Sequence, residues 1–327
     1  MSSVASTVRS SRSERRGVRR LLASDTSYRG VLRASGVLFL IVLAGLIVVI
    51  VQRAWPAFQH FGPGFVTGQT WDPVHVRYGA LPYIVGTLFT AAVAILIALP
   101  IGVGTAIFLA ELAPRWSRGP VSTLVELLAA VPSVVFGLWG LLAVAPWVSA
   151  VLEPRIQQVT HSFVIFRGAP LGVGVLLASL ILAAMVIPTI AAISRDVLAA
   201  VPDEQKEAAM ALGATRWQMV RKAMLPVSLN GVLGATTLAL GRALGETMAV
   251  TMVIGNKVGT LPDSLFSPAN TIASVIANEF TEATEPFHLS SLLALAAILL
   301  VISLLVNILA RGLVWSVGRE QVGADLL

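Results

Sequence analysis

The sequence contains no cysteine, which excludes disulfides, thiolate nucleophiles and cysteine-based metal sites. Histidine is also scarce: the chain has four, His60, His75, His161 and His288, and no two of them have the spacing of metal ligands on one helix. The phosphate-binding pattern G-x-x-x-x-G-K-[ST] is absent as well. We therefore expect no catalytic residues, no metal site and no bound nucleotide on this chain.

Charged residues are few, at 12% of the 327 residues, whereas about 25% is usual in a soluble domain. Hydrophobic residues make up 56% and gather in segments long enough to cross a bilayer. These segments predict an all-α integral membrane protein with six transmembrane helices, at about 31–51, 83–112, 121–148, 171–194, 227–254 and 289–314. The net charge of +6 comes from arginines that flank these spans, so it does not indicate nucleic-acid binding.

The distribution of Lys and Arg predicts how the chain is oriented. With six spans, seventeen of these residues lie on the side of the N-terminus and five on the opposite side, while Arg242 lies inside a span. Because positive residues collect in cytoplasmic segments, we expect both termini to be cytoplasmic. Residues 1–30 form an Arg- and Ser-rich tail with few apolar side chains, which we expect to be disordered. Residues 319–327 form the cytoplasmic C-terminus.

The fifth span carries two charges, Arg242 and Glu246. An ionisable residue at membrane depth costs about 2.5–3.5 kcal/mol on insertion scales, so these two should face protein or water rather than lipid. Four residues apart on one helix, they should share a face. They form either an ion pair that fixes helix packing, or an anion path in which Arg242 holds the anion and Glu246 tempers the positive charge. Thr247 would add a hydrogen bond to that path.

The segment 195–226, between the fourth and fifth spans, carries several helix-end signals. In chain order these are Pro202, Asp203, Glu204, Gly213, Thr215 and Gln218. Proline and acidic residues favour a helix start, glycine favours a left-handed end, and Thr followed by Gln three residues later is a capping box. We predict two short helices joined by a sharp turn, which either enter a partner's groove or lie on the membrane as an amphipathic hairpin.

Two further local predictions concern the segment after the fifth span and the start of the third. The stretch Thr271–Phe280 has a helical apolar rhythm and should form a short helix on the outer side. Glu126 stands near the cytoplasmic start of the predicted third span, where a snorkelling or capping role is expected.

The segment 195–226, called the coupling loop below, resembles the signature of permease subunits of ABC importers. That signature is Glu-Ala-Ala, three residues, Gly, nine residues, then an aliphatic position, any residue and Leu-Pro. The matching residues are Glu207, Ala208, Ala209, Gly213, Leu225 and Pro226. Ala223 stands where the family usually has Ile. The resemblance implies a type I ABC importer permease fold over residues 31–318, in which this coupling loop docks into a separate ATPase.

Three runs narrow the resemblance to phosphate-specific transport permeases of the PstC type: Glu126–Gly140, Gly241–Asn256 and Ser267–Phe280. It implies the transmembrane subunit of an ATP-driven phosphate importer in the plasma (inner) membrane of a prokaryote. The implied partners are a PstA-like permease, a PstB-like ATPase dimer that holds ATP and Mg²⁺, and a PstS-like phosphate-binding protein. Arg242, Glu246 and Thr247 would line the substrate path.

Other functions remain open on the sequence. The same machine could carry another oxyanion, such as sulfate or molybdate. An ion-driven secondary transporter would predict inverted repeats, and we find no internal repeat. A membrane sensor without a transport role is a further alternative.

Overall fold

The computed structural model describes the backbone of residues 4–160 and 163–324, and the side chains of residues 28–160, 163 and 165–312. The described chain is largely helical, with one small antiparallel sheet in which β1 (Trp71–Asp72) pairs with β2 (Arg77–Tyr78). The chain divides into two units, residues 1–53 and residues 54–327, which are considered separately.

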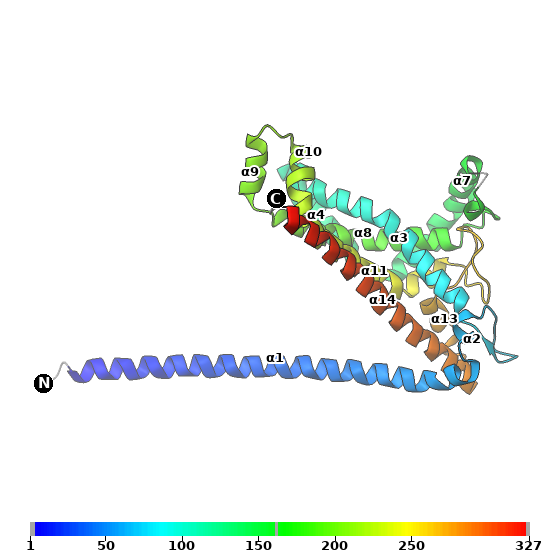
Figure 1. The fold of residues 1–327 in the computed structure, drawn as a ribbon, viewed down its shortest axis with the longest axis horizontal. Coiled ribbons are helices and arrows are strands. Elements are labelled where there is room, and N and C mark those ends of the chain that lie inside the picture. The colour runs from blue at the N-terminus through cyan, green and yellow to red at the C-terminus, as the bar shows by residue number, and fades with distance from the viewer. Residues whose placement is uncertain (1–3, 161–162, 325–327) are drawn as a thin grey trace. The chain divides into compact units, whose positions relative to one another are not determined.

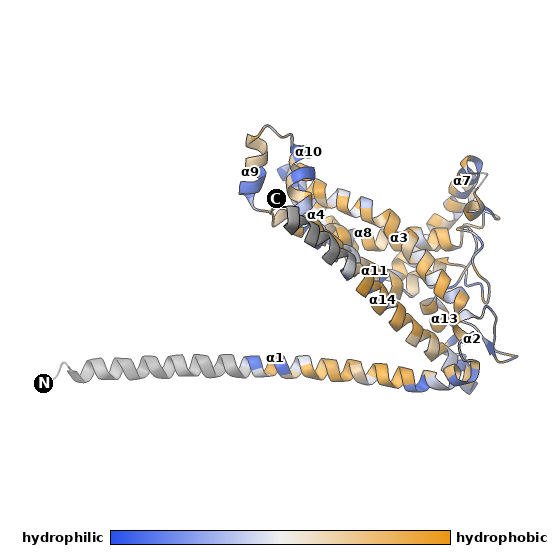
Figure 2. Cartoon of the chain, in the orientation of Figure 1, coloured by the Kyte–Doolittle hydropathy of each residue, from blue (hydrophilic) through white to orange (hydrophobic). Residues whose placement is uncertain are grey.

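Six helical segments among the described residues are long and apolar enough to cross a membrane, which confirms the predicted number. Figure 2 shows their hydrophobic character. The segments are Tyr28–Phe61, Leu81–Leu112, Ser133–Val159, Val175–Ala199, Arg216–Gly245 and Pro286–Gly312.

The first unit consists of α1 (Val4–Phe61), whose last turns extend into the second unit. The helix begins at Val4, so the tail that we expected to be disordered is helical from that residue. The segment that precedes the apolar run has no proline, and seven of its first thirty residues are arginine, a good helix former, so the helix can propagate back from the span. The cytoplasmic location of the tail stays a prediction, as does that of the C-terminus.

The second unit contains the remaining helices, which are listed here in chain order. They are α2 (Gly64–Thr67), α3 (Leu81–Ile107), η1 (Phe108–Leu112), α4 (Arg115–Ala129), α5 (Ser133–Trp139), η2 (Gly140–Val144), α6 (Ala145–Trp147), η3 (Val148–Leu152), α7 (Glu153–Val159), η4 (Val164–Phe166), α8 (Val175–Ala199), α9 (Asp203–Ala211), α10 (Arg216–Met219), η5 (Val220–Met224), α11 (Leu225–Gly245), α12 (Met248–Val253), α13 (Ile272–Glu279) and α14 (Pro286–Ala324).

Helix α8 is the centre of the second unit, since α3 and α11 both pack along it and also against each other. Small residues on α3 make this possible: Ala91, Ala94 and Ala98 are buried and join a core with Leu182 and Ile190 of α8. Small side chains let membrane helices approach closely, so that van der Waals contact replaces the hydrophobic effect as the source of association. This three-helix contact fixes the position of α11, which carries Arg242.

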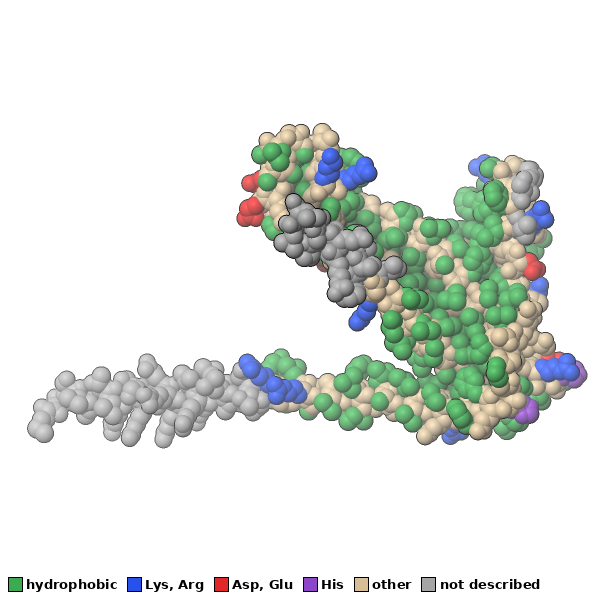
Figure 3. Space-filling view, in the orientation of Figure 1, with side chains coloured by type: hydrophobic (Ala, Val, Ile, Leu, Met, Phe, Trp, Pro, Cys, Tyr) green, Lys and Arg blue, Asp and Glu red, His purple; other side chains and the backbone are tan. Residues whose placement is uncertain are grey.

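Different helices form the two ends of the second unit. In Figure 1, α9 and α10 lie at one end, and α2, α7 and α13 lie at the opposite end. Figure 3 shows charged side chains at these ends and hydrophobic ones on the surface between them. The expected helix within Thr271–Phe280 is confirmed as α13, with a capping box formed by Thr271 and Ser274. A helical unit with polar ends and an apolar middle suits a bilayer.

The predicted third span, residues 121–148, is wrong in its bounds. Helix α4 ends at Ala129, the helical conformation is interrupted before Pro132, and the span runs from Ser133 to Val159. Proline has no N–H group to continue the preceding helix, and it disfavours a helical conformation at the residue before it. The residues before the break therefore form a separate amphipathic helix instead of the start of a span.

Glu126 consequently lies on α4 rather than on the third span. Its Oε1 accepts hydrogen bonds from Arg195 Nη1 at 3.1 Å and from Ser122 Oγ at 3.3 Å. Arg195 is on α8, so the pair joins α4 to the central helix. The expected snorkelling or capping role is replaced by this ion pair, which is partly exposed and therefore modest in strength.

The tightest approach on α3 yields a prediction. A Cβ atom at Gly86 would lie 2.1 Å from the backbone oxygen of Asn270, whereas one at Gly104 on the same helix would meet nothing within 4 Å. Gly86→Ala should therefore lower the melting temperature of the purified protein in detergent, at a cost of about 1–3 kcal/mol, as overpacking usually does. Gly104→Ala is the matched control and should leave the melting temperature unchanged or raise it slightly, because alanine is a better helix former than glycine. Equal effects of the two variants would contradict the packing described.

Candidate functional site

The fifth span contains a break between its two charges. Helix α11 ends at Gly245, Glu246 is extended with φ −67° and ψ 127°, and α12 begins at Met248. The predicted continuous span of residues 227–254 is wrong in this respect, and Arg242 and Glu246 do not share a helical face. The side chain of Glu246 forms a hydrogen bond with the backbone: its Oε1 accepts from Ala249 N at 3.4 Å. This bond satisfies an N–H group in the first turn of α12.

Arg242 lies in the last turn of α11 and its side chain is exposed in this single chain. It makes no ion pair with Glu246 or with another acidic residue in the part of the chain that the structure describes. The packing interpretation, a buried Arg242–Glu246 pair, is therefore not what the structure contains. The guanidinium keeps its donors for another acceptor.

Arg242 lines an open cavity of about 510 Å³. Its lining residues come from three spans: Thr189 on α8, Asn307 on α14, and Thr237, Leu238, Gly241 and Arg242 on α11. Asn307 Nδ2 donates to Ser303 O at 2.7 Å, which leaves the amide oxygen as an acceptor, and Thr237 Oγ1 donates to Leu233 O at 2.9 Å. The cavity thus combines a fixed positive charge with uncharged acceptors, a set suited to an oxyanion that carries a proton.

Thr247, the third predicted path residue, lies at the break as the residue that precedes α12. Its Oγ1 donates to Gly245 O at 3.2 Å, and its carbonyl accepts from Thr251 Oγ1 at 2.7 Å. Both groups are engaged in holding the break. Thr247 and Glu246 are half-buried and, unlike Arg242, do not line the cavity.

The loop of residues 195–226 folds as predicted into two short helices, α9 and α10. Gly213 has φ +84°, a left-handed conformation that side chains disfavour, and it makes the sharp turn. Thr215 and Gln218 form the expected capping box, with Thr215 N donating to Gln218 Oε1 at 2.9 Å. The turn and cap fix the loop without help from burial, since every residue of α9 is at least partly exposed.

The exposed face of this loop includes two residues of the Glu-Ala-Ala motif, Glu207 and Ala208, while Ala209 is half-buried. The apolar side chains of Leu212 and Trp217 are 90% and 55% exposed. Clustered apolar exposure of this kind marks a surface that binds a partner or a membrane. The geometry is compatible with both interpretations made from the sequence, namely that the loop enters a partner's groove or that it lies on the membrane.

The loop is joined to the spans in two ways. First, Lys206 Nζ lies 3.0 Å from Glu111 Oε1 at the end of η1, and 3.2 Å from Asp203 Oδ1. Burial lowers the pKa of the Lys206 ammonium, but its hydrogen bonds to these carboxylates outweigh that effect and raise the pKa overall, so the charge is held. Second, η5 connects α10 directly to α11, which begins at Leu225 and Pro226 as predicted. A displacement of the loop would therefore be transmitted along α11.

At the opposite end of the unit, an aromatic and acidic cluster was not found by sequence reasoning. Glu279 Oε2 accepts from Trp71 Nε1 at 2.8 Å and lies 2.9 Å from His288 Nε2. The Tyr78 ring stacks on His288 with centroids 5.7 Å apart. Burial, helped by the nearby charges of Glu285 and Glu279, raises the pKa of Tyr78 to about 12. The only sequence signal was the wealth of aromatic residues in the segment 52–80, which includes Trp71.

Solved structures with the same architecture define the class of the fold. A chain of the bacterial alginate ABC transporter, solved in complex with an alginate pentasaccharide-bound periplasmic protein, superposes with a TM-score of 0.56 at 18% identity, covering 88% of this chain and 93% of that one. A chain of the inward-facing MetNI methionine ABC transporter gives 0.54 at 18% identity, covering 76% and 99%. The chain therefore has the type I ABC importer permease fold, as the sequence predicts.

The family model of the binding-protein-dependent transport system inner membrane component matches residues 99–317. The phosphate transport system permease protein PstC of Mesorhizobium japonicum is 45% identical over 308 residues, which is 93% of each chain. That of Haemophilus influenzae is 45% identical over 84% of this chain and 88% of its own length. The chain belongs to this transport family and, within it, to the PstC-type permease proteins. It is a multi-pass membrane protein.

The cluster of Trp71, Tyr78, Glu279 and His288 yields a stability prediction. Trp71→Phe keeps an aromatic ring but removes the indole N–H that Glu279 accepts, so it should lower the free energy of unfolding by about 1.5–3 kcal/mol, the usual contribution of a hydrogen bond to a charged group. Thermal melting of the purified protein measures this. Trp116→Phe is the control, because the Trp116 side chain is 81% exposed. The cluster would have no structural role if both variants melted at the wild-type temperature.

Proposed function

We propose that this chain is the transmembrane subunit of an ATP-driven importer of inorganic phosphate. The observation that carries the proposal is the Arg242 guanidinium, which has no acidic partner among the described residues and lines a cavity between three spans. Relatives 45% identical to this chain are named phosphate transport system permeases, which supports phosphate as the substrate. A guanidinium offers a planar fork of donors that matches a tetrahedral oxyanion.

The acceptors beside Arg242 favour phosphate over sulfate or molybdate. At neutral pH phosphate keeps at least one P–OH group, whereas sulfate is fully deprotonated. The Asn307 amide oxygen can accept a hydrogen bond from that hydroxyl, but it would repel an oxyanion that has no proton to donate. Transport of another oxyanion is the alternative function, and competition by sulfate or molybdate in a phosphate uptake assay separates the two.

Glu246 keeps a role in this proposal, although a different one from an ion pair on the same helical face. It lies just after α11 and bonds to the first turn of α12. Its carboxylate lowers the positive potential near Arg242, which keeps the guanidinium from holding the anion too tightly. Thr247 fixes the break through its own hydrogen bonds. The two residues therefore position the end of α11, and Arg242 contacts the anion.

Import against an inside-negative membrane potential costs about 2.3 kcal/mol per charge per 100 mV, so an energy source is required. The sequence has no phosphate-binding loop for a nucleotide. We therefore place ATP and Mg²⁺ on a separate PstB-like ATPase dimer, which would dock on α9 and the turn at Gly213. A PstA-like permease would complete the path as a heterodimer, and a PstS-like protein would deliver phosphate from outside.

The membrane is the plasma (inner) membrane of a prokaryote in this proposal, with both termini in the cytoplasm. The excess of Lys and Arg on the side of the coupling loop supports this orientation. It places α9 and α10 on the side where ATP is available, and the Trp71–Glu279–His288 cluster on the outer side.

Arg242→Ala should reduce phosphate uptake by about tenfold to a hundredfold, because the hydrogen bonds of a charged group are lost from the path. Uptake of labelled phosphate into cells that lack the native chain measures this. The amount of assembly that co-purifies with the variant should be unchanged, since Arg242 makes no ion pair in the described chain. Full uptake by a normally assembled Arg242→Ala importer would eliminate the proposed role of Arg242.

Gly213→Val should leave the permease in the membrane but detach the ATPase. Valine disfavours the left-handed conformation of Gly213, so the turn between α9 and α10 would change. Gly62→Val is a matched control. Gly62 also has a left-handed φ, +56°, with open space around it, but it lies just before α2, at the end of the second unit opposite to the coupling loop (Figure 1). Affinity purification followed by an immunoblot for the ATPase compares them. Normal ATPase recovery with Gly213→Val would argue against docking at this loop.

A further inference from the structure

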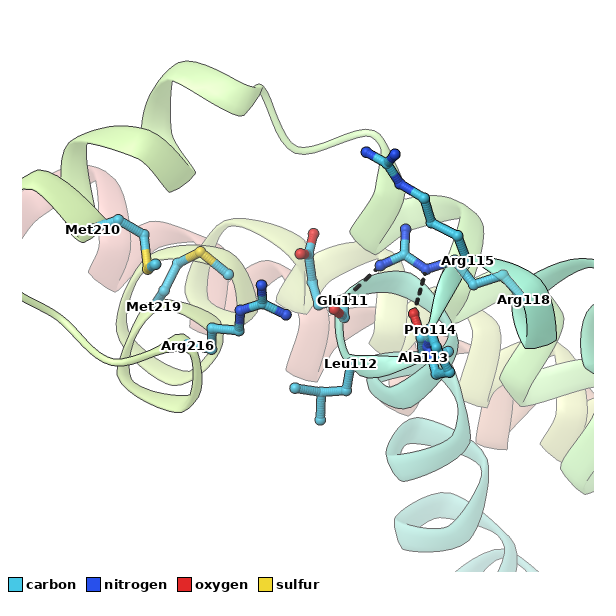
Figure 4. A pocket seen from close by; sticks show the side chains of 9 residues that line it. All are labelled: Glu111, Leu112, Ala113, Pro114, Arg115, Arg118, Met210, Arg216 and Met219. Carbon is cyan, nitrogen blue, oxygen red and sulfur yellow. Dashed lines mark hydrogen bonds between the residues drawn. The ribbon is translucent and has the colours of Figure 1, made fainter.

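A second cavity, of about 550 Å³, lies between the coupling loop and the end of the span formed by α3 and η1. Figure 4 shows Arg216 extending from α10 toward Glu111, and Arg118 reaching back to the carbonyl groups at the end of η1. Its charged lining residues are Glu111, Arg115, Arg118 and Arg216. This cavity is separate from the one that Arg242 lines.

The cavity has an excess of positive charge. Three arginines and one glutamate line it, and the glutamate, Glu111, already pairs with Lys206 at 3.0 Å. Arg118 is held in place by hydrogen bonds to Ala113 O at 2.9 Å and Glu111 O at 3.2 Å. The exposed side chains of Arg115 and Arg216 have no hydrogen bond or ion pair to any residue that the structure describes. Two guanidinium groups are thus available beside a third that is already oriented.

The surroundings indicate that this cavity lies at a membrane surface. Trp116 and Trp217, each next to a lining arginine, are 81% and 55% exposed. Exposed tryptophans are typical of the boundary between lipid and water. Helix α4, which begins at Arg115, also exposes Leu124 and Leu127. Leu112, Met210 and Met219 give the cavity an apolar part beside its charges, which suits a group with both a phosphate and a hydrocarbon portion.

We propose that this cavity binds a phosphate group, carried either by an anionic phospholipid headgroup or by inorganic phosphate. Arginine forks bind phosphate oxygens in pairs, and three arginines line this cavity. Arg216 belongs to α10, whereas Arg115 and Arg118 begin α4. A bound phosphate would therefore bridge the coupling loop and the start of α4, which Arg118 ties to the end of η1. Occupancy would then restrain the loop. The site does not depend on which substrate the permease carries.

The test uses the membrane assembly of both permeases and the ATPase dimer, without the PstS-like protein and with Arg242→Ala as background, so that neither the binding protein nor the path contributes to phosphate binding. In the first arm, nanodiscs contain phosphatidylcholine with or without phosphatidylglycerol, and native mass spectrometry counts the phosphatidylglycerol retained after detergent extraction. In the second arm, inorganic phosphate is titrated calorimetrically in phosphatidylcholine nanodiscs. Binding in the first arm identifies a lipid headgroup, and binding in the second identifies free phosphate.

Arg115→Gln with Arg216→Gln should weaken whichever probe binds by at least about tenfold, since hydrogen bonds to a charged group are lost. Each substitution is also made singly, so that the loss is measured in a variant with the wild-type melting temperature. Arg221→Gln with Lys222→Gln is the control: it removes the same charge from exposed residues of the same segment that do not line the cavity. If neither probe binds more weakly to the first pair than to the control pair, the proposal is overturned.

Discussion

A guanidinium inside a membrane span has to be compensated, and this constraint explains much of the arrangement of α11. Arg242 makes no ion pair with a residue that the structure describes, and it instead lines a cavity that α8 and α14 help to form. The helix ends three residues later, and the chain turns before α12. Non-helical backbone at membrane depth is tolerated where it is covered by protein or lines a water-filled space. The break and the charge therefore belong to one polar region.

The packing of α3, α8 and α11 gives this region its position. Buried alanines on α3 allow close contact with α8, and α11 rests against both helices. From Arg216 to Gly245 the chain is helical without interruption, so α10 of the coupling loop and Arg242 lie on one element. The sixteen residues from Pro226 to Arg242 correspond to about 24 Å at helical rise. A rigid element of this length can carry a displacement of the loop to the cavity.

Several features could be predicted from the sequence because they depend on local chemistry. The left-handed Gly213, the Thr215–Gln218 capping box and the short helix α13 are each specified within a few residues. The number of spans follows from apolar length alone. Two boundaries failed for a common reason: hydropathy is similar on both sides of Pro132 and of Glu246, so apolar length does not reveal a break. The proline was visible in the sequence, but a proline inside a membrane helix is often tolerated.

The cavities and the Trp71–Glu279–His288 cluster could not be predicted, because their members are distant in sequence. Asn307 approaches Arg242 only when α14 packs on α11, and Trp71 meets Glu279 only when the segment after α1 folds over α13. Glu246 shows the limit of helical periodicity: four residues from Arg242, it would share its face only in a continuous helix. The sequence identifies Arg242 and Glu246 as charged residues within a predicted span, but their arrangement depends on backbone geometry that the sequence pattern does not reveal.

The central claim is that phosphate contacts Arg242 during transport. Phenylglyoxal modifies accessible guanidinium groups, and peptide mass spectrometry can follow each arginine separately in the working assembly supplied with ATP. The account predicts that phosphate slows the modification of Arg242 but not that of Arg221, and that sulfate does not protect Arg242. Equal rates of Arg242 modification with and without phosphate, in an assembly that is transporting, would contradict it.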